Sequence, residues 1–245
     1  MTNPRIPGTW HVSFTVMAVG IAALSGCAHR GPGQDTLREE WRMICHELSQ
    51  RGASVSDIHA RGTMVLERKG GIRNRLLCRL RYQEPDRLSL DASHRMGGKV
   101  FGVTSGDGSW IMEYQTPAGA ESWKGSDRDP FLGMPANDLA RCLVFGAPPG
   151  GALKAKVRRS KEGVTYLARF RTGGYRYEIT VVGPDWHMHE LTIRKGRLAS
   201  LVAAFVFDPS GESLLVDIPP ANIKADIQWE SVQHNQESTA NESAT

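Results

Sequence analysis

The residues that most clearly could do chemistry are two histidines in segment 187–190, HMHE. On a β-strand, His187 and His189 project from the same face, where two imidazoles could share a metal ion. This signal is weak, because a zinc site uses at least three protein ligands and no third candidate stands nearby. The ordinary interpretation is a solvated strand beside the turn at 183–185. We therefore predict no metal site and no cofactor.

Motifs of catalysis are also missing from the sequence. It contains no G-x-S-x-G nucleophile elbow, no glycine-rich phosphate loop and no recognisable Cys/His arrangement, and its glycine-rich places look like hairpin turns. No catalytic residue is predicted, so we do not expect an enzyme. The 30 basic and 26 acidic residues leave a net charge of only +4. Nucleic-acid-binding proteins concentrate basic charge, so we exclude nucleic acid as a partner.

Cys27 could also carry chemistry, because its thiol directly follows an apolar run and the residues Leu24-Ser25-Gly26. The run covers residues 14–24, too short for a membrane-spanning helix of roughly 20 residues but typical of the core of a secretory signal. The tetrapeptide Leu24-Ser25-Gly26-Cys27 resembles the lipobox of bacterial lipoproteins. That resemblance implies a signal peptide over residues 1–26 and lipidation of Cys27. The alternative is an ordinary cleaved signal with a chance cysteine.

The same resemblance implies where the protein is located. Two or more acyl chains on Cys27 would give stable membrane anchoring. Bacterial lipoproteins with Asp after this cysteine stay in the inner membrane, whereas residue 28 here is alanine. The expected location is therefore the outer membrane, facing the periplasm, with residues 27–36 as acylated N-terminus and tether. Cys45, Cys78 and Cys142 remain, and three thiols allow at most one disulfide.

The elements expected to carry these residues are one helix followed by many strands. Apolar residues recur at helical spacing from Asp35, a predicted N-cap, to a stop at Gly52. From Ile58 the apolar period changes to two, which predicts strands. Between 126 and 150 the strand pattern lapses into an apolar loop at 129–135 and a short helix over 138–145, capped by Asn137. About eleven strands are expected: near 58–66, 76–82, 88–92, 100–104, 109–115, 153–159, 164–171, 175–182, 187–194, 201–208 and 223–229.

This order of elements, with two short motifs, resembles the LolA and LolB superfamily of lipoprotein carriers and acceptors. The motifs are EPDRL at 84–88 and DGSWIMEY at 107–114. The resemblance implies a mainly β, α+β fold: a curved, antiparallel, unclosed barrel of about eleven strands, with helices capping its open mouth. We place this domain at residues 37–230 and expect a disordered polar tail over 231–245.

A fold of this kind implies an apolar cavity that accepts acyl chains. The apolar strand faces supply the expected ligand-binding residues: Met64, Leu66, Leu80, Tyr82, Leu88, Leu90, Tyr177, Ile179 and Phe205. The apolar loop supplies residues that would gate the cavity or touch a membrane: Phe131, Leu132 and Met134. Periodicity alone also fits a filled core and a folded lid. The expected function is binding of a lipid or of an acylated protein, and the alternative is a structural lipoprotein that holds a protein partner in the envelope.

Two rows of cations complete the pattern. Arg73, Arg75, Arg79 and Arg81 alternate along one predicted strand, and Lys154, Lys156 and Arg158 along another. If the two rows were adjacent, they could bind anionic lipid headgroups or an acidic partner. The more common explanation is a solvated outer face of a sheet.

Overall fold

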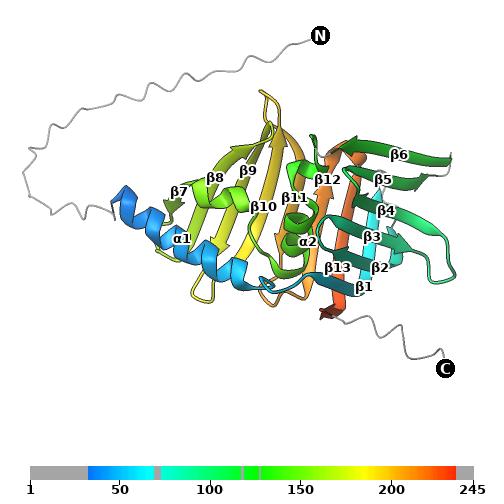
Figure 1. The fold of residues 1–245 in the computed structure, drawn as a ribbon, viewed down its shortest axis with the longest axis horizontal. Helices are drawn as coiled ribbons and strands as arrows, with labels where there is room; N and C mark the ends of the chain where they lie inside the picture. Colours follow the sequence, from blue (N-terminus) through cyan, green and yellow to red (C-terminus); the bar gives the residue numbers. More distant parts are fainter. Residues whose placement is uncertain (1–32, 69–72, 117–118, 127, 236–245) are drawn as a thin grey trace, which may run out of the picture. The chain divides into compact units, whose positions relative to one another are not determined.

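The fold is described by a computed structural model over residues 33–68, 73–116, 119–126 and 128–235 (Figure 1). The predicted signal peptide and Cys27 lie outside these residues. Residues Pro32–Thr245 form one compact unit, and every residue of the buried core belongs to it, so this unit carries its own core. None of its described helices is long and apolar enough to cross a membrane.

The described residues form one antiparallel sheet of thirteen strands, ordered β6-β5-β4-β3-β2-β1-β13-β12-β11-β10-β9-β8-β7. The sheet is unclosed, with β6 and β7 as its edges (Figure 1). The strands are β1 Asp57–Arg68, β2 Arg73–Gln83, β3 Arg87–Ser93, β4 Lys99–Gly106, β5 Ser109–Thr116, β6 Gly119–Ser126, β7 Lys156–Arg159, β8 Thr165–Thr172, β9 Tyr175–Val182, β10 His187–Lys195, β11 Ser200–Phe207, β12 Ser213–Ile218 and β13 Ile223–His234.

The alternation of side chains gives the sheet an apolar inner face and a polar outer face. On β2, Leu80 and Tyr82 are buried whereas Arg79 and Arg81 are exposed, as the period-two pattern predicts. At the centre of the sheet, β1 pairs with β13 through a register shift at Gly62. A side chain there would overlap the backbone carbonyl of Gln228, so the close approach of the two strands requires glycine.

Two helices and three short 3-10 helices complete the unit. They are α1 Gln34–Gln50, η1 Phe131–Gly133, α2 Ala136–Phe145, η2 Gly150–Lys154 and η3 Pro219–Ala221. The chain passes from edge strand β6 to edge strand β7 through η1, α2 and η2, and α2 lies over the inner face of the sheet (Figure 1). The apolar residues that recur at helical spacing along α1 are buried at Trp41, Ile44, Cys45 and Leu48. Trp41 Nε1 also donates a hydrogen bond of 2.8 Å to the carbonyl of Ala152 in η2.

Both predicted helix caps are wrong. The α1 helix begins one residue before Asp35 and is capped by Gly33, without a side-chain hydrogen bond. The N-cap of α2 is Pro135, which places Asn137 inside the first turn, where its buried Oδ1 has no hydrogen-bond partner among the described residues. The predicted end of α2 holds, because Gly146 adopts the left-handed conformation with φ 61° and its N–H bonds back into the helix.

The expected strand count of about eleven is too low by β6 and β12. The sequence of β6, GAESWKGS, lacks an apolar alternation because nearly all of its side chains face solvent. The β12 strand is short and runs directly into Pro219. Two boundaries also differ: Lys154 belongs to η2 rather than to a strand, and β13 continues to His234, past the expected domain end at 230.

The two cationic rows do not meet. The arginines of β2 and the cations of β7 lie on strands separated by seven others in the sheet. Arg73 is paired with Glu67 on the neighbouring strand β1. The condition for a joint basic surface, that the two rows be adjacent, is therefore not met.

Candidate functional site

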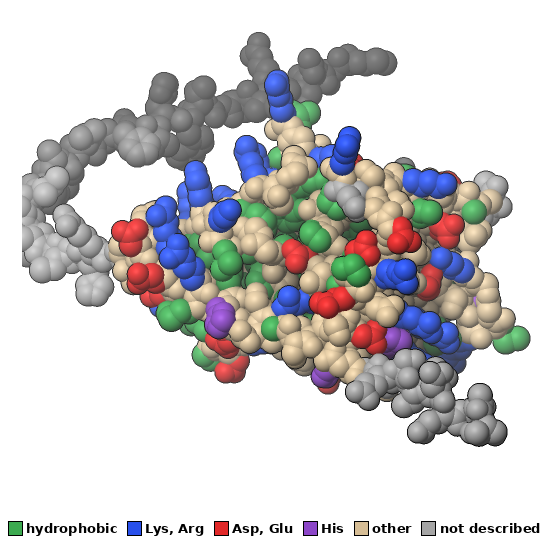
Figure 2. Space-filling model, viewed as in Figure 1, with side chains coloured by type: hydrophobic (Ala, Val, Ile, Leu, Met, Phe, Trp, Pro, Cys, Tyr) green, Lys and Arg blue, Asp and Glu red, His purple; other side chains and the backbone are tan. Residues whose placement is uncertain are grey.

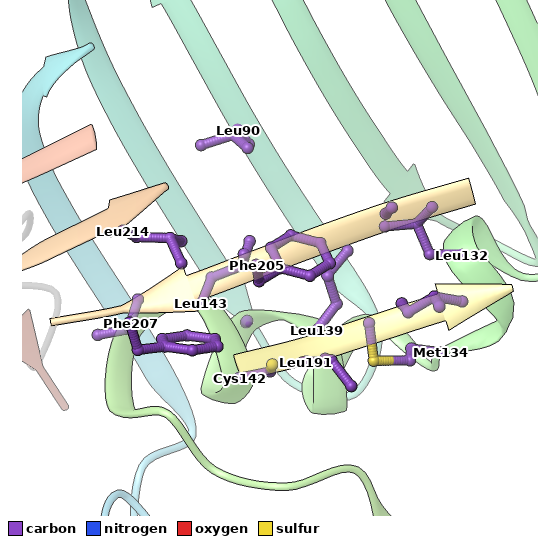
Figure 3. Close-up of a cluster of buried hydrophobic side chains, with 14 of the residues drawn as sticks. Leu90, Leu132, Met134, Leu139, Cys142, Leu143, Leu191, Phe205, Phe207 and Leu214 are labelled. Carbon is purple, nitrogen blue, oxygen red and sulfur yellow. The ribbon is translucent and has the colours of Figure 1, made fainter. Parts of the chain in front are cut away.

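The inner face of the sheet encloses a small cavity whose lining is entirely apolar. Its volume is about 40 Å³, close to the roughly 30 Å³ that one water molecule occupies in the liquid. Strands β1, β3, β4, β11, β12 and β13 form its walls, and η1 and α2 close it. Figure 3 shows Leu132, Leu139 and Leu143 of these closing elements beside Phe205 of β11. In this conformation the interior is almost filled.

The closing elements belong to residues 129–145, which we call the cover segment. Its loop is held by hydrogen bonds from strands far apart in the sheet. The hydroxyl of Tyr177 on β9 donates to the carbonyl of Leu132 at 2.9 Å, and Trp110 Nε1 on β5 donates to the carbonyl of Asp129 at 2.7 Å. Burial raises the pKa of Tyr177, so its phenol stays protonated and remains a donor. The Trp110 ring also meets Phe131 edge to face at 5.1 Å.

The backbone of the cover segment is strained where it enters the core. Leu132 is buried and has φ 56° and ψ 20°, the left-handed region that branched and bulky side chains rarely adopt. Such a conformation costs about 1–3 kcal/mol and persists only where the surroundings impose it. The carbonyl of this residue accepts the hydrogen bond from Tyr177, and its side chain is buried in the core.

A charged cluster holds the outer end of the cover segment. Lys195 Nζ lies 3.3 Å from Asp129 Oδ1 and 3.0 Å from the Tyr175 hydroxyl, which itself donates to Asp129. The hydrogen bond with Tyr175 raises the pKa of Lys195, with the Asp129 carboxylate adding to the effect. Both charged side chains are about half exposed, so this pair contributes little stability. The charged contacts at the outer end of the cover segment are therefore weak.

A groove of about 290 Å³ adjoins the cavity and is lined partly by the cover segment. The groove and the cavity share four lining residues: Leu88, Val103, Phe131 and Leu139. These side chains form the partition between them. Because Phe131 and Leu139 come from the cover segment, a shift of that segment would join the two spaces.

The predicted ligand-binding residues fall into two groups. Five of them line the cavity together with Phe131 and Leu132: Met64, Leu66, Leu88, Leu90 and Phe205. Leu80, Tyr82, Tyr177 and Ile179 are buried on the sheet but do not line it. Met134 lines the groove instead, with Phe131. The predicted residues are thus buried, but only about half of them meet at one cavity.

Sequence reasoning missed several residues of this site. The missed cavity residues are Phe101, Val103, Leu139, Leu143, Val216, Ile218, Ile223, Ala225 and Ile227. The alternation along β13 was a usable signal for three of them. The residues that fasten the cover segment, Asp129, Trp110, Tyr175 and Lys195, carry no local signal, because they are brought together only by the curvature of the sheet.

A larger hollow of about 1250 Å³ lies on the polar outer face near the start of β1. Its charged lining is mixed, with Asp57, Glu84 and Asp107 facing Arg81 and Arg87. Apolar side chains such as Leu88 and Ile111 line it as well, but they are interrupted by charged groups of both signs, whereas the lining of the inner cavity is apolar throughout. The hollow is therefore a poorer candidate for ligand binding than the inner cavity.

The remaining reactive side chains are three cysteine thiols and the two histidines of β10. Cys45, Cys78 and Cys142 are free and buried. Burial raises the pKa of the Cys45 and Cys78 thiols to about 12, so both are unreactive at neutral pH. No group of three metal-binding side chains occurs among the described residues, His187 and His189 included. Burial lowers the pKa of His187, and the neighbouring His189 adds to this effect.

Comparisons with known proteins give similarity of fold only. The sequence matches no protein-family model and no curated protein. Among solved structures, an outer membrane lipoprotein-sorting protein domain from Vibrio parahaemolyticus matches with 14% identity, a TM-score of 0.49, and coverage of 82% of this chain and 95% of that one. A DUF1329 family protein from Desulfovibrio piger matches with 11% identity, a TM-score of 0.43, and coverage of 81% and 93%.

A LolA superfamily protein from Nitrosomonas europaea matches as well, with 5% identity, a TM-score of 0.41, and coverage of 80% of this chain and 94% of that one. At these identities and scores the three matches say nothing of the ligand of this chain.

Proposed function

We propose that this chain binds an apolar ligand, such as a lipid or the acyl chains of a lipoprotein, between the inner face of its sheet and the cover segment. The observation that carries the proposal is the wholly apolar cavity, separated from a larger groove by four side chains, of which Phe131 and Leu139 belong to the cover segment. Together the two spaces reach the lower end of the range for small-molecule sites, about 300 Å³. Binding would consist of apolar burial, at about 0.8 kcal/mol per methylene group, with no bond made or broken.

The ligand enters, in this proposal, when the cover segment moves outward. A space of about 40 Å³ is too small for an acyl chain, so the closed conformation cannot hold one. Release of the strain at Leu132 offsets part of the cost of opening. The half-exposed pair of Lys195 and Asp129 adds little resistance.

Anchoring forms the second part of the proposal. Lipidation of Cys27 would tether the binding domain to the outer membrane, facing the periplasm, so that it acts as a resident acceptor or transfer protein. The lipobox-like tetrapeptide before residue 28 supports this placement. Metabolic labelling with palmitate tests it: the wild-type chain should be labelled and fractionate with outer membranes, and Cys27→Ala should do neither. A wild-type protein that is soluble and unlabelled would refute the proposed anchoring through Cys27.

Ligand binding is tested by native mass spectrometry of residues 32–245, which contain the whole buried core. The probes are phosphatidylethanolamine and a diacylated peptide. Val216 is half-buried and lines the cavity, so Val216→Phe should fill it and reduce uptake by at least tenfold. The matched control is Val202→Phe, because Val202 is also half-buried against the core but does not line the cavity.

The opposite outcome would favour the second candidate function, a structural lipoprotein that holds a protein partner. Two observations support that alternative: the cavity is almost filled, and β6, the edge of the sheet formed by the described strands, presents mostly exposed side chains. If the wild-type domain takes up neither probe, ligand binding is wrong and the sheet edge becomes the surface to study.

A further inference from the structure

The outer face of the sheet carries a line of arginines across three adjacent strands. In the sheet register, Arg171 of β8 is the direct partner of Arg176 of β9, and Arg176 is the direct partner of Arg194 of β10. Like charges directly opposite one another in neighbouring strands repel. Arg197 follows in the turn between β10 and β11, at the same end of the sheet. We call these four residues the arginine cluster.

The repulsion in the arginine cluster is not compensated within the described part of the chain. None of its four arginines forms an ion pair there, and the contact of Arg194 is to the backbone carbonyl of Ala199. Glu178, which points to the same face of β9, is already engaged by Arg169. Figure 2, which views the helix-covered side, shows Lys and Arg side chains along the edge of the unit where the β10–β11 turn lies. A surface of this kind is complementary to a strongly anionic partner.

The turn beside the arginine cluster also presents a bare apolar side chain. Leu198 follows Arg197 in the β10–β11 turn and is 94% exposed. An apolar tip flanked by cations matches the interface of an anionic bilayer, where the leucine enters below the headgroups and the guanidinium groups bind phosphates. An acidic protein surface would satisfy the arginines but would leave Leu198 without an apolar environment.

We propose that the arginine cluster and Leu198 form a docking surface for an anionic phospholipid bilayer. This proposal does not depend on the ligand proposed for the inner cavity. The surface is nevertheless continuous with that site, because Lys195, at the base of the same hairpin, bonds to Asp129 of the cover segment. Docking would therefore bring the bilayer next to the segment that closes the cavity.

The chain offers matched controls on another part of its surface. The outer face of β2 carries Arg75, Arg79 and Arg81. There Arg79 stands between Arg61 of β1 and Asp91 of β3, so a carboxylate shares the row with the arginines. Met96, in the β3–β4 turn, is as exposed as Leu198 and is likewise preceded by an arginine. Replacing these residues changes charge and apolarity by the same amounts without touching the arginine cluster.

The test is co-sedimentation of residues 32–245 with vesicles of phosphatidylcholine alone and of phosphatidylcholine mixed with phosphatidylglycerol. The wild-type domain should bind only the mixed vesicles, and high salt should weaken the binding. Each arginine contributes about fivefold, the equivalent of about 1 kcal/mol, so Arg171→Gln combined with Arg176→Gln and Arg194→Gln should weaken binding roughly 100-fold. Leu198→Ser should weaken it about tenfold.

The controls decide whether this surface is responsible. Arg75→Gln combined with Arg79→Gln and Arg81→Gln, and separately Met96→Ser, should bind mixed vesicles within about twofold of wild type. The proposal is overturned if the wild-type domain does not bind mixed vesicles. It is also overturned if the control variants lose as much binding as the triple variant of the arginine cluster and Leu198→Ser. Circular dichroism of every variant verifies the fold, and Leu198→Ser, on a fully exposed turn, keeps the test decisive if the triple variant unfolds.

Discussion

Replacing Tyr177 with phenylalanine should loosen the cover segment without disturbing the sheet. The hydroxyl of Tyr177 is wholly buried and makes a single hydrogen bond, 2.9 Å long, to the carbonyl of Leu132. Tyr177→Phe keeps the ring, which stacks on Phe170 at 4.8 Å, and removes only this bond. The closed conformation then retains the strain of Leu132 and gains a buried carbonyl without a partner.

The size of the effect follows from these contacts. A neutral hydrogen bond contributes about 1 kcal/mol net, and a buried carbonyl left unpaired costs about 1–3 kcal/mol. When the segment opens, water satisfies that carbonyl, so the penalty falls on the closed state alone. A shift of about 2 kcal/mol raises the population of the open state roughly thirtyfold.

Hydrogen exchange measures this population. The amides of Gly133 and Met134 bond to carbonyls within the same loop, at 2.7 and 3.2 Å, so their exchange reports opening. We expect exchange roughly thirtyfold faster in Tyr177→Phe, with the amides of the central strands β1 and β13 changed only by any loss of global stability. Tyr166→Phe is the control, because the buried Tyr166 donates to Glu40 of α1, away from the loop. Unchanged loop exchange in Tyr177→Phe, or an equal increase in Tyr166→Phe, would refute the reasoning.

Three further outcomes are expected. Gly62→Ala should destabilise the domain by more than about 2 kcal/mol in chemical denaturation, because its methyl group overlaps β13. Gly33→Ala, with open space around it, should cost only the N-cap preference, about 1 kcal/mol or less, and equal stabilities would contradict the close approach. A thiol reagent at mildly alkaline pH should leave Cys45 and Cys78 unmodified in the folded domain and label both after unfolding, and rapid native labelling would show that they are accessible. The folded state lowers the pKa of His187, so this residue costs no stability above the unfolded pKa of about 6.5 and costs stability as the pH falls below it. His187→Gln should therefore lose less stability in acid than the wild type. Identical pH profiles of stability in the two proteins would show that His187 is not responsible.

The sequence was informative wherever burial follows a local period. The stripe of α1 and the alternation of Leu80 and Tyr82 with Arg79 and Arg81 identified the helix, the strands and the inner face of the sheet. Hairpin turns then implied antiparallel neighbours, because strands joined by short loops usually pair. The antiparallel class was predictable for these reasons, whereas the unclosed barrel was implied by the resemblance to the LolA and LolB superfamily. The edge strand β6 was not predictable, since a strand exposed on most of its length has no apolar period.

Tertiary structure alone decided the size and closure of the cavity. Leu66, Leu88 and Phe205 have the same pattern whether they line an empty space or fill a core, because periodicity reports the side of a strand and not what stands opposite. The space left between them depends on residues 129–145, which arrive from the far edges of the sheet. The contact between Tyr177 and Leu132 spans 45 residues of sequence and has no local signal.

Register is the other property that the sequence left open. The sequence contains Arg171, Arg176 and Arg194 as separate residues among many others, and only strand pairing places them side by side. A shift of one residue would move an arginine to the opposite face of its strand. The sequence by itself therefore determined which side chains are apolar, charged or reactive and which elements they form. The three-dimensional packing determined which of them meet, because the contacts that set cavity volume and charge clustering join strands distant in the chain.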